Sequence, residues 1–422
     1  MDVEEKLTLE QVANILGKSK ETIRRWDNIG KLTAFREPIS NYRYYQKSQL
    51  NVFEEFKLKE KDLKLLTTNE TVPNSDFTVL ELFAGAGGLA VGLEQAGLRC
   101  VALNEIDHWA SETLRINRPN WNVIEEDIRR LSFKHLEGEV DVVTGGFPCQ
   151  AFSYAGKRFG FQDARGTLFY EFARTVNETR PKICIGENVK GLLSHDSGRT
   201  LQSMIAILDE IGYRVMDPKV LKAIYHKVPQ KRERLILVGI RKDLEETFKF
   251  PEPNKKIYNL KDALKKGALY DSDVAQSAGT KYPASKKEVL DLVPPGGYWR
   301  DLPVELQKSY MQKSYFLGGG KTGMARRISW NEPSLTLTCS PAQKQTERCH
   351  PDETRPFTVR EYARIQTFPD EWIFAGPVSA QYKQIGNAVP VNMAKEIGMS
   401  IVDFLNKVYK LEGSISLIEN CI

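Results

Sequence analysis

Short apolar runs alternate with amphipathic segments over most of the 422-residue chain. Runs at 77–83, 100–104, 140–143, 183–185 and 235–239 have the length and composition of buried strands. Helical spacing follows the first of these runs, and turn-forming glycines separate the segments. Strands that alternate with helices predict an open α/β sheet, in which ligands bind beyond the carboxyl ends of the strands.

The first 57 residues have a different pattern. Leu7, Val12, Ile15 and Leu16 have helical spacing, and a second helix is expected from about 21 to 28. The basic and aromatic stretch 41–45 predicts a β-wing. This order resembles the winged helix-turn-helix head of the MerR and excisionase families, which implies that four basic residues meet DNA phosphates or bases, namely Lys20, Arg24, Arg25 and Arg43. A protein-docking module with a solvated basic face is the alternative.

Composition limits the class of protein. Residues 58–75 are charged and then polar, as in a linker. A net charge of +5 permits a polyanionic partner without requiring one. The six cysteines lack CxxC spacing, which favours a reducing compartment and gives no zinc signature. Without a signal peptide or an apolar run long enough to span a membrane, the protein is expected to be soluble, cytoplasmic and free of metal.

A glycine-rich turn follows the strand 77–83. Gly85-x-Gly87-x-x-Ala90 fits the nucleotide-binding fingerprint, and Glu105 follows the next strand, where it can accept hydrogen bonds from a ribose. Both NAD and S-adenosylmethionine carry that ribose, so this motif alone leaves the choice open. Asp127 is a candidate for holding an adenine amino group, and an ordinary loop carboxylate is the alternative.

Three reactive side chains follow or begin later strands. Two glycines and Pro148 end the strand 140–143 and open a loop, and Cys149 lies just past the carboxyl end of that strand, where a thiol can act as a nucleophile or be a small apolar residue. Glu187 follows the strand 183–185, and Arg234 begins the strand 235–239. Cations and glycines between 156 and 166 suit either a lid over an anionic substrate or a solvated loop.

Five blocks in sequence order carry a family resemblance. They are Phe83-x-Gly85-x-Gly87-Gly88, Gly146-Phe147-Pro148-Cys149-Gln150-x-Phe152-Ser153, Glu187-Asn188-Val189, Gln230-Lys231-Arg232-Glu233-Arg234 and Gln384-x-Gly386-Asn387-Ala388-Val389. Together they resemble the DNA (cytosine-5) methyltransferase family over about residues 77–405. The resemblance implies a Rossmann-like mixed sheet that binds S-adenosylmethionine. It divides the chain into a head at 1–57, a linker at 58–75, catalytic segments at 76–242 and 356–422, and an inserted target-recognition domain at 243–355.

The same resemblance assigns roles to individual residues. Cys149, Glu187, Arg232 and Arg234 would form the catalytic set. The residues expected to hold S-adenosylmethionine are Phe83, Gly85, Ala86, Gly87, Gly88, Glu105, Ile106, Asp127, Ile128, Pro148, Leu168, Asn387, Ala388 and Val389. Besides the arginines of the head, the residues expected to contact double-stranded DNA are Gln150, Ser153, Arg165, Arg326 and Arg327. The local chemistry of the insertion agrees, because arginine, lysine and glutamine on loops can read base edges, although a solvated insertion is the alternative.

The expected function is therefore sequence-specific methylation of a flipped cytosine in a restriction-modification system, with a cognate restriction endonuclease as a candidate functional partner. The head adds a candidate role in autoregulatory DNA binding. An RNA cytosine-5 methyltransferase, a repressor on an inactive methyltransferase fold and a nicotinamide oxidoreductase are the alternatives. The target sequence cannot be read from one chain.

Overall fold

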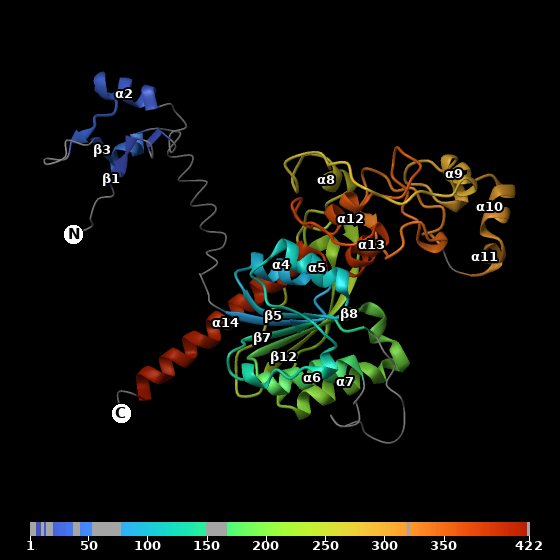
Figure 1. Ribbon diagram of the computed structural model, residues 1–422, viewed down its shortest axis with the longest axis horizontal. Helices are drawn as coiled ribbons and strands as arrows, with labels where there is room; N and C mark the ends of the chain where they lie inside the picture. Colours follow the sequence, from blue (N-terminus) through green and yellow to red (C-terminus); the bar gives the residue numbers. More distant parts are fainter. Residues whose placement is uncertain are drawn as a thin grey trace. The chain divides into compact units, whose positions relative to one another are not determined.

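The structure is a computed structural model, and it describes residues 6–9, 12–13, 20–36, 43–52, 77–148, 167–318 and 321–419 (Figure 1). The chain divides into two compact units, Met1–Pro73 and Asn74–Ile422. Among the described residues, no helix is long and apolar enough to cross a membrane.

The first unit contains a small sheet beside a basic helix. Its elements are β1 (Lys6–Thr8), α2 (Lys20–Asn28), β2 (Phe35–Arg36), β3 (Arg43–Gln46) and the 3₁₀ helix η1 (Lys47–Val52). The strands have the order β1-β3-β2 and are antiparallel. The predicted wing is therefore β2 and β3. Leu7 lies in β1 opposite Tyr45, so its expected place in a first helix was wrong, whereas Val12 is helical and buried.

A mixed sheet organises the second unit. Within the described residues, eight strands make up this sheet, with β10-β12-β8-β7-β4-β5-β6 in order and β9 paired to β12. Strands β4 to β8 run parallel, and β12 is antiparallel to β8, β9 and β10. The strand bounds are β4 (Thr78–Leu82), β5 (Arg99–Glu105), β6 (Val123–Glu125), β7 (Val142–Gly145), β8 (Ile183–Val189), β9 (Tyr213–Val215), β10 (Lys219–Lys222) and β12 (Glu233–Arg241).

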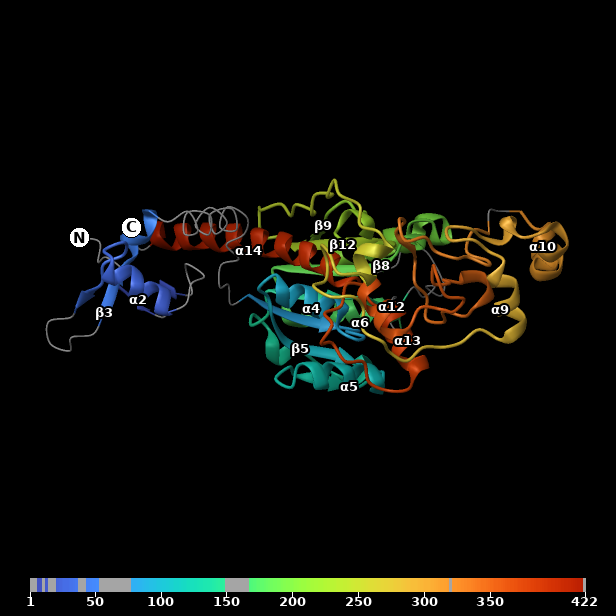
Figure 2. The same cartoon turned by 90° about the horizontal axis from the view of Figure 1, so that it is seen from above.

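Helices cover both faces of the sheet because successive strand residues point to opposite sides. Leu80, Val143 and Leu237 face α6 (Leu168–Thr179) and α7 (Arg199–Glu210). Val79 and Val142 face α4 (Gly88–Gln95) and α14 (Val391–Glu419). Figures 1 and 2 both show α14 running beside α4. The helix α5 (His108–Asn117) packs in a third apolar cluster together with residues of the returning segment.

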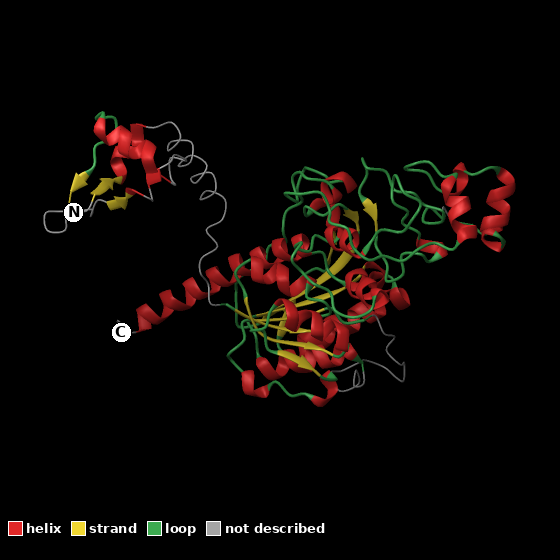
Figure 3. Cartoon of the chain, turned by 45° about the horizontal axis from the view of Figure 1, so that its top comes forward, coloured by secondary structure: helices red, strands yellow, loops and turns green. Residues whose placement is uncertain are grey.

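The insertion has its own apolar cluster around α9 (Ala284–Asp291), α10 (Val304–Met311) and α11 (Lys313–Phe316). Loops make up most of the remaining insertion (Figure 3). Its early helix α8 (Leu260–Leu264) instead packs with α12 (Val359–Ile365) in the cluster of the catalytic body. The boundary predicted at residue 243 stays a prediction.

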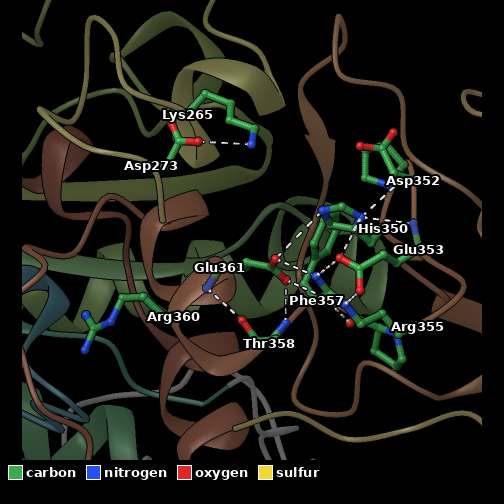
Figure 4. Close-up of polar contacts among 12 residues, drawn as sticks. Lys265, Asp273, His350, Asp352, Glu353, Arg355, Phe357, Thr358, Arg360 and Glu361 are labelled. Carbon is green, nitrogen blue, oxygen red and sulfur yellow. Dashed lines mark hydrogen bonds and ion pairs between the residues drawn. The ribbon is translucent and has the colours of Figure 1, made fainter. Parts of the chain in front are cut away.

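A polar network joins the insertion to α12 (Figure 4). Arg355 makes a two-armed ion pair with the buried carboxylate of Glu361, at 2.7 and 2.9 Å. Glu361 also accepts from the backbone N–H of Thr358, which closes the capping box of α12. The buried ring of His350 accepts from the N–H of Glu353 at 3.2 Å. These contacts hold the segment that leads into α12, and α13 (Val378–Asn387) follows α12 in the chain. The short parallel pair β11 (Gln230–Lys231) and β13 (Ser334–Leu335) ties the insertion to the body a second time.

Candidate active site

Strand register places the predicted blocks at one edge of the sheet. Leu82 pairs with Gly145, and Gly145 pairs with Gly186, so β4, β7 and β8 are level where their motifs begin. Ile236 of the antiparallel β12 lies opposite Glu187, which brings the start of β12 to the same edge. The loops at this edge surround a cavity of about 820 Å³, within the range of ~300–1,000 Å³ that is typical of ligand pockets.

The cavity contains most of the residues expected to hold a cofactor. Those that line it are Phe83, Gly85, Gly88, Glu105, Ile106, Asp127, Ile128, Pro148, Leu168, Asn387, Ala388 and Val389. Ala86 and Gly87 do not line the cavity. A Cβ on Gly87 would lie 2.7 Å from Leu114 and 3.1 Å from Trp372, so this part of the turn faces the core.

The glycine-rich turn brings the first and last blocks into contact. A Cβ on Gly88 would lie 2.3 Å from the carbonyl oxygen of Val389, so a side chain there is excluded. The carboxylate of Glu105 accepts from the N–H of Gly85 and the N–H of Asp107, each at 2.7 Å. Burial raises the pKa of Glu105, while these N–H donors act against the rise. Asp107 in turn pairs with Lys383 of α13 at 2.7 Å, and both residues line the cavity.

Asp127 also lines the cavity. Its carboxylate binds the guanidinium of Arg129 and caps the turn that contains Ile128. These contacts, chiefly the hydrogen bonds from the Arg129 side chain, lower the pKa of Asp127 to about 2. Asp127 is therefore a charged acceptor at any physiological pH.

A carboxylate and a guanidinium that both line the cavity face each other. Glu187 Oε1 lies 2.5 Å from Arg234 Nε, and each side chain is about 12% exposed. Burial raises the pKa of Glu187, and Arg234 and Arg232 oppose that rise. A Cβ on Gly146 would approach Glu187 Oε2 to 3.0 Å, which explains a glycine beside this carboxylate.

The loop that leads to the predicted nucleophile begins beside this ion pair. Asn188 donates from its side-chain amide to the backbone carbonyl of Phe147, at 2.8 Å. Pro148 lines the cavity. The predicted Cys149, Gln150, Ser153 and Arg165 lie outside the described residues, so their placement stays a prediction.

The predicted catalytic Arg232 lies close enough to Glu187 to act on its pKa, but it is not part of the cavity lining. Its side chain is 1% exposed, and it donates to the carbonyls of Leu337, Gly386 and Asn387. Burial lowers the pKa of Arg232 to about 9. Arg232 therefore holds backbone segments in place.

Two predicted DNA contacts in the insertion have partners inside the insertion. Arg327 is 5% exposed and donates to the carbonyls of Leu290 and Val293. This burial argues against its expected contact with DNA. Arg326 forms an ion pair with Glu332 at 2.6 Å, with only 12% of its side chain exposed. In the head, Arg24 and Arg25 are exposed on α2. Arg43 instead forms an ion pair with Asp27, in which Nη1 lies 3.4 Å from Oδ2.

Glu81, which lies in β4 and lines the cavity, is not among the site residues predicted from the sequence. It is 2% exposed, and its Oε2 has no hydrogen-bond partner. Burial raises its pKa well above the ordinary value. A single carboxylate within an apolar strand was the available signal, because unpaired buried acids are rare.

The fold and the cavity define an α/β enzyme with a nucleoside-sized pocket that is lined in part by a paired carboxylate and guanidinium. The model of the C-5 cytosine-specific DNA methylase family matches residues 77–403, and that of the MerR helix-turn-helix regulatory proteins matches residues 7–65. The chain belongs to the C-5 cytosine-specific DNA methylase family, and the protein is a DNA (cytosine-5) methyltransferase with a MerR-like head.

Curated relatives match nearly the whole chain. The Type II methyltransferase M.Eco47II of Escherichia coli is 61% identical over 97% of this chain and 98% of its own length. The Type II methyltransferase M.PspPI of Psychrobacter is 55% identical over 94% of this chain and 96% of its own length. A crystal structure of a prophage-encoded E. coli protein, described as a DNA modification methyltransferase, matches 78% of this chain and 99% of its own length. The TM-score is 0.55 at 24% sequence identity, so this similarity supports the fold.

Proposed function

We propose that the protein methylates carbon 5 of a flipped cytosine in duplex DNA, with S-adenosyl-L-methionine as the methyl donor and a covalent bond between Cys149 and the base as an intermediate. The pairing of Glu187 with Arg234, in the lining of a nucleoside-sized cavity, is the observation that carries this proposal. Near-full-length relatives named Type II methyltransferases support a role in a restriction-modification system. We further propose that the protein acts in the cytoplasm, with a cognate endonuclease as functional partner.

The lining of the cavity fits the proposed donor. Glu81 offers a buried, unpartnered carboxylate oxygen to the donor's ammonium group. Glu105 would accept from the ribose, and the exposed apolar side chain of Ile106 would pack against the adenine. Asn387, which also lines the cavity, would bind a polar group of the donor. When bound there, S-adenosyl-L-methionine supplies an electrophilic methyl group.

Cytosine carbon 5 needs activation because it is a weak nucleophile. The thiolate of Cys149 would add to carbon 6, forming a C–S bond and moving electron density to carbon 5. Glu187, whose pKa is raised by burial, would donate a proton to N3 and accept from the exocyclic amine. Arg234 would orient Glu187 and bind O2. Once carbon 5 carries the methyl group, loss of its proton to a base expels the thiolate and restores the ring.

Carbon 6 is not accessible inside a stacked duplex, so the cytosine must leave the helix. Gln150 and Ser153 on the Cys149 loop are proposed to fill the gap or bind phosphate, together with Arg165. The insertion is proposed to read the surrounding bases. The head, with Arg24 and Arg25 exposed, is proposed to bind a separate DNA site and regulate expression.

Bisulfite sequencing of DNA from cells that express the protein tests this function and maps the target. We expect protected cytosines within one short sequence. Transfer of tritium from labelled S-adenosyl-L-methionine to duplex DNA, compared with tRNA, identifies the nucleic acid. Labelling of tRNA alone would contradict the proposal in favour of an RNA methyltransferase.

A further inference from the structure

Both backbone groups of Leu337 are held by side chains from one short segment of the catalytic body. The N–H of Leu337 donates to Gln230 Oε1 at 3.0 Å, and its carbonyl accepts from Arg232 Nη1 at 3.3 Å. Gln230, Arg232 and Leu337 are all buried. Leu337 lies two residues beyond β13, within the predicted recognition insertion.

The side chains of Gln230 and Arg232 also connect to residues 385–388 of the returning segment, Gln230 through Gln366 and Arg232 directly. Gln230 Nε2 donates to Gln366 Oε1 at 2.9 Å, and Gln366 Nε2 donates to the carbonyls of Ile385 and Ala388. Arg232 Nη2 donates to the carbonyls of Gly386 and Asn387, at 3.0 and 3.3 Å. We call Gln230, Arg232 and Gln366 the Leu337 clamp.

Close packing reinforces the clamp. A Cβ on Gly386 would lie 2.7 Å from the backbone nitrogen of Cys339 and 2.7 Å from the carbonyl carbon of Thr338. The insertion and the cavity wall therefore meet backbone to backbone. Asn387 and Ala388, which carry two of the clamped carbonyls, line the cavity.

A contribution to stability does not explain why a charged Arg232 is buried in the clamp. Arg232 is 1% exposed, and the hydrogen bonds of its guanidinium go to carbonyl oxygens. Placing a charge there is costly, and apolar residues that fill the same space usually cost less. Hydrogen bonds to fixed carbonyls, however, hold two backbone segments in one register.

We propose that the Leu337 clamp couples the recognition insertion to the donor wall, so that binding of target DNA tightens binding of the methyl donor. Gln230, Arg232 and Gln366 act as positioning residues in this coupling. The inference rests on the proposed function, because it takes the cavity as the donor site and the insertion as the reader of DNA. Coupling between two sites is commonly about 5–150-fold in affinity, and it is reciprocal.

The test uses the full-length protein and measures binding of S-adenosyl-L-homocysteine, the expected product, by calorimetry. Affinity is compared without DNA and with a duplex that carries the site mapped by bisulfite sequencing. We expect the duplex to tighten binding about fivefold or more in the wild type. In Arg232→Lys and in Gln366→Met, which lose donors to the clamped carbonyls, we expect this factor to fall towards one. The KM for S-adenosyl-L-methionine should rise more than kcat falls.

Arg327→Lys is the matched control. Arg327 is also a buried arginine that donates to carbonyls, but its partners at Leu290, Val293 and His350 all lie within the insertion. We expect it to lower thermal stability about as much as Arg232→Lys while the coupling factor stays at the wild-type value. If Arg232→Lys does not fold, the glutamine variants Gln366→Met and Gln230→Met decide the question.

Two results would overturn the inference alone. One is a wild type that methylates the duplex without coupling, and the other is full coupling in folded clamp variants. A wild type that methylates no DNA would overturn the proposed function, and the inference with it.

Discussion

Asn188 donates to the backbone carbonyl of Phe147 at 2.8 Å in a buried hydrogen bond. Asn188 directly follows Glu187, and Phe147 stands two residues before Cys149. This single bond therefore fixes the start of the loop with the proposed nucleophile relative to the carboxylate that is proposed to bind the base.

Asn188→Ala leaves the Phe147 carbonyl without this donor and frees the start of the loop. We expect kcat to fall by about 10- to 100-fold, because small displacements of a reacting group are costly. The control is Asn392→Ala, which removes an amide bond to the carbonyl of Lys227, outside the cavity lining. A kcat within twofold of the wild type would show that this bond does not position the loop.

Cys149→Ser tests the nucleophile. A serine hydroxyl ionises far less readily than a thiol, so we expect methyl transfer to fall by about a thousandfold or more. Binding of duplex DNA and of S-adenosyl-L-homocysteine should survive, as gel shifts and calorimetry can show. Cys100→Ser, in a half-buried strand position outside the cavity lining, should keep turnover. Near-normal turnover in Cys149→Ser would exclude the covalent scheme.

The pH profile tests Glu187. Its pKa is raised by burial, so the protonated form that donates to N3 persists above the ordinary pKa of glutamate. Activity should fall as the pH rises through that raised pKa, while ionisation of Cys149 acts in the opposite direction. Glu187→Gln should lower kcat by about 100-fold or more and remove the falling limb in single-turnover measurements. A falling limb that persists in the variant would assign it to another group.

Glu81 links stability to pH. Because burial raises its pKa, the folded state binds a proton that the unfolded state has lost, and stability falls as the pH rises through this range. The free energy of unfolding of Glu81→Gln, measured with urea, should equal that of the wild type near pH 4 and exceed it increasingly towards pH 8. This variant should also bind S-adenosyl-L-homocysteine about 10-fold more weakly, or worse, because a bond to the ammonium loses its charge. Unchanged affinity would remove Glu81 from the donor site.

Arg24→Ala combined with Arg25→Ala tests the head. Both side chains are exposed on α2, and loss of two phosphate or base contacts should weaken binding to an operator-like site about 10-fold or more at fixed salt. Methylation of ordinary target sites should stay intact. Lys407→Ala with Lys410→Ala removes two charges from α14 and serves as the control. If no such site is found upstream of the gene, or the double change leaves its binding unaltered, the regulatory role fails.

The sequence by itself determined which segments meet at the site. Glycines and short apolar runs mark where strands end, and parallel strands end at a common edge. From this rule alone, Gly85, Glu105 and Glu187 are predicted to lie at one edge of the sheet, and all three line the cavity there. Arg234 reaches the same edge because β12 is antiparallel to β8. The family resemblance supplied the cavity wall at Asn387, which lies far away in sequence.

Only the tertiary structure decided how individual side chains are used. Arg232 and Arg234 are two residues apart and would share a face in a regular strand, but the chain breaks between β11 and β12 at Arg232. One guanidinium therefore turns to carbonyls of the insertion and the returning segment, and the other faces Glu187. Arg327 is likewise turned inward by carbonyls that lie more than twenty positions away. Local pattern fixes where a strand begins and ends, but the hydrogen-bond partners of a buried cation come from distant segments that only the packed chain brings together.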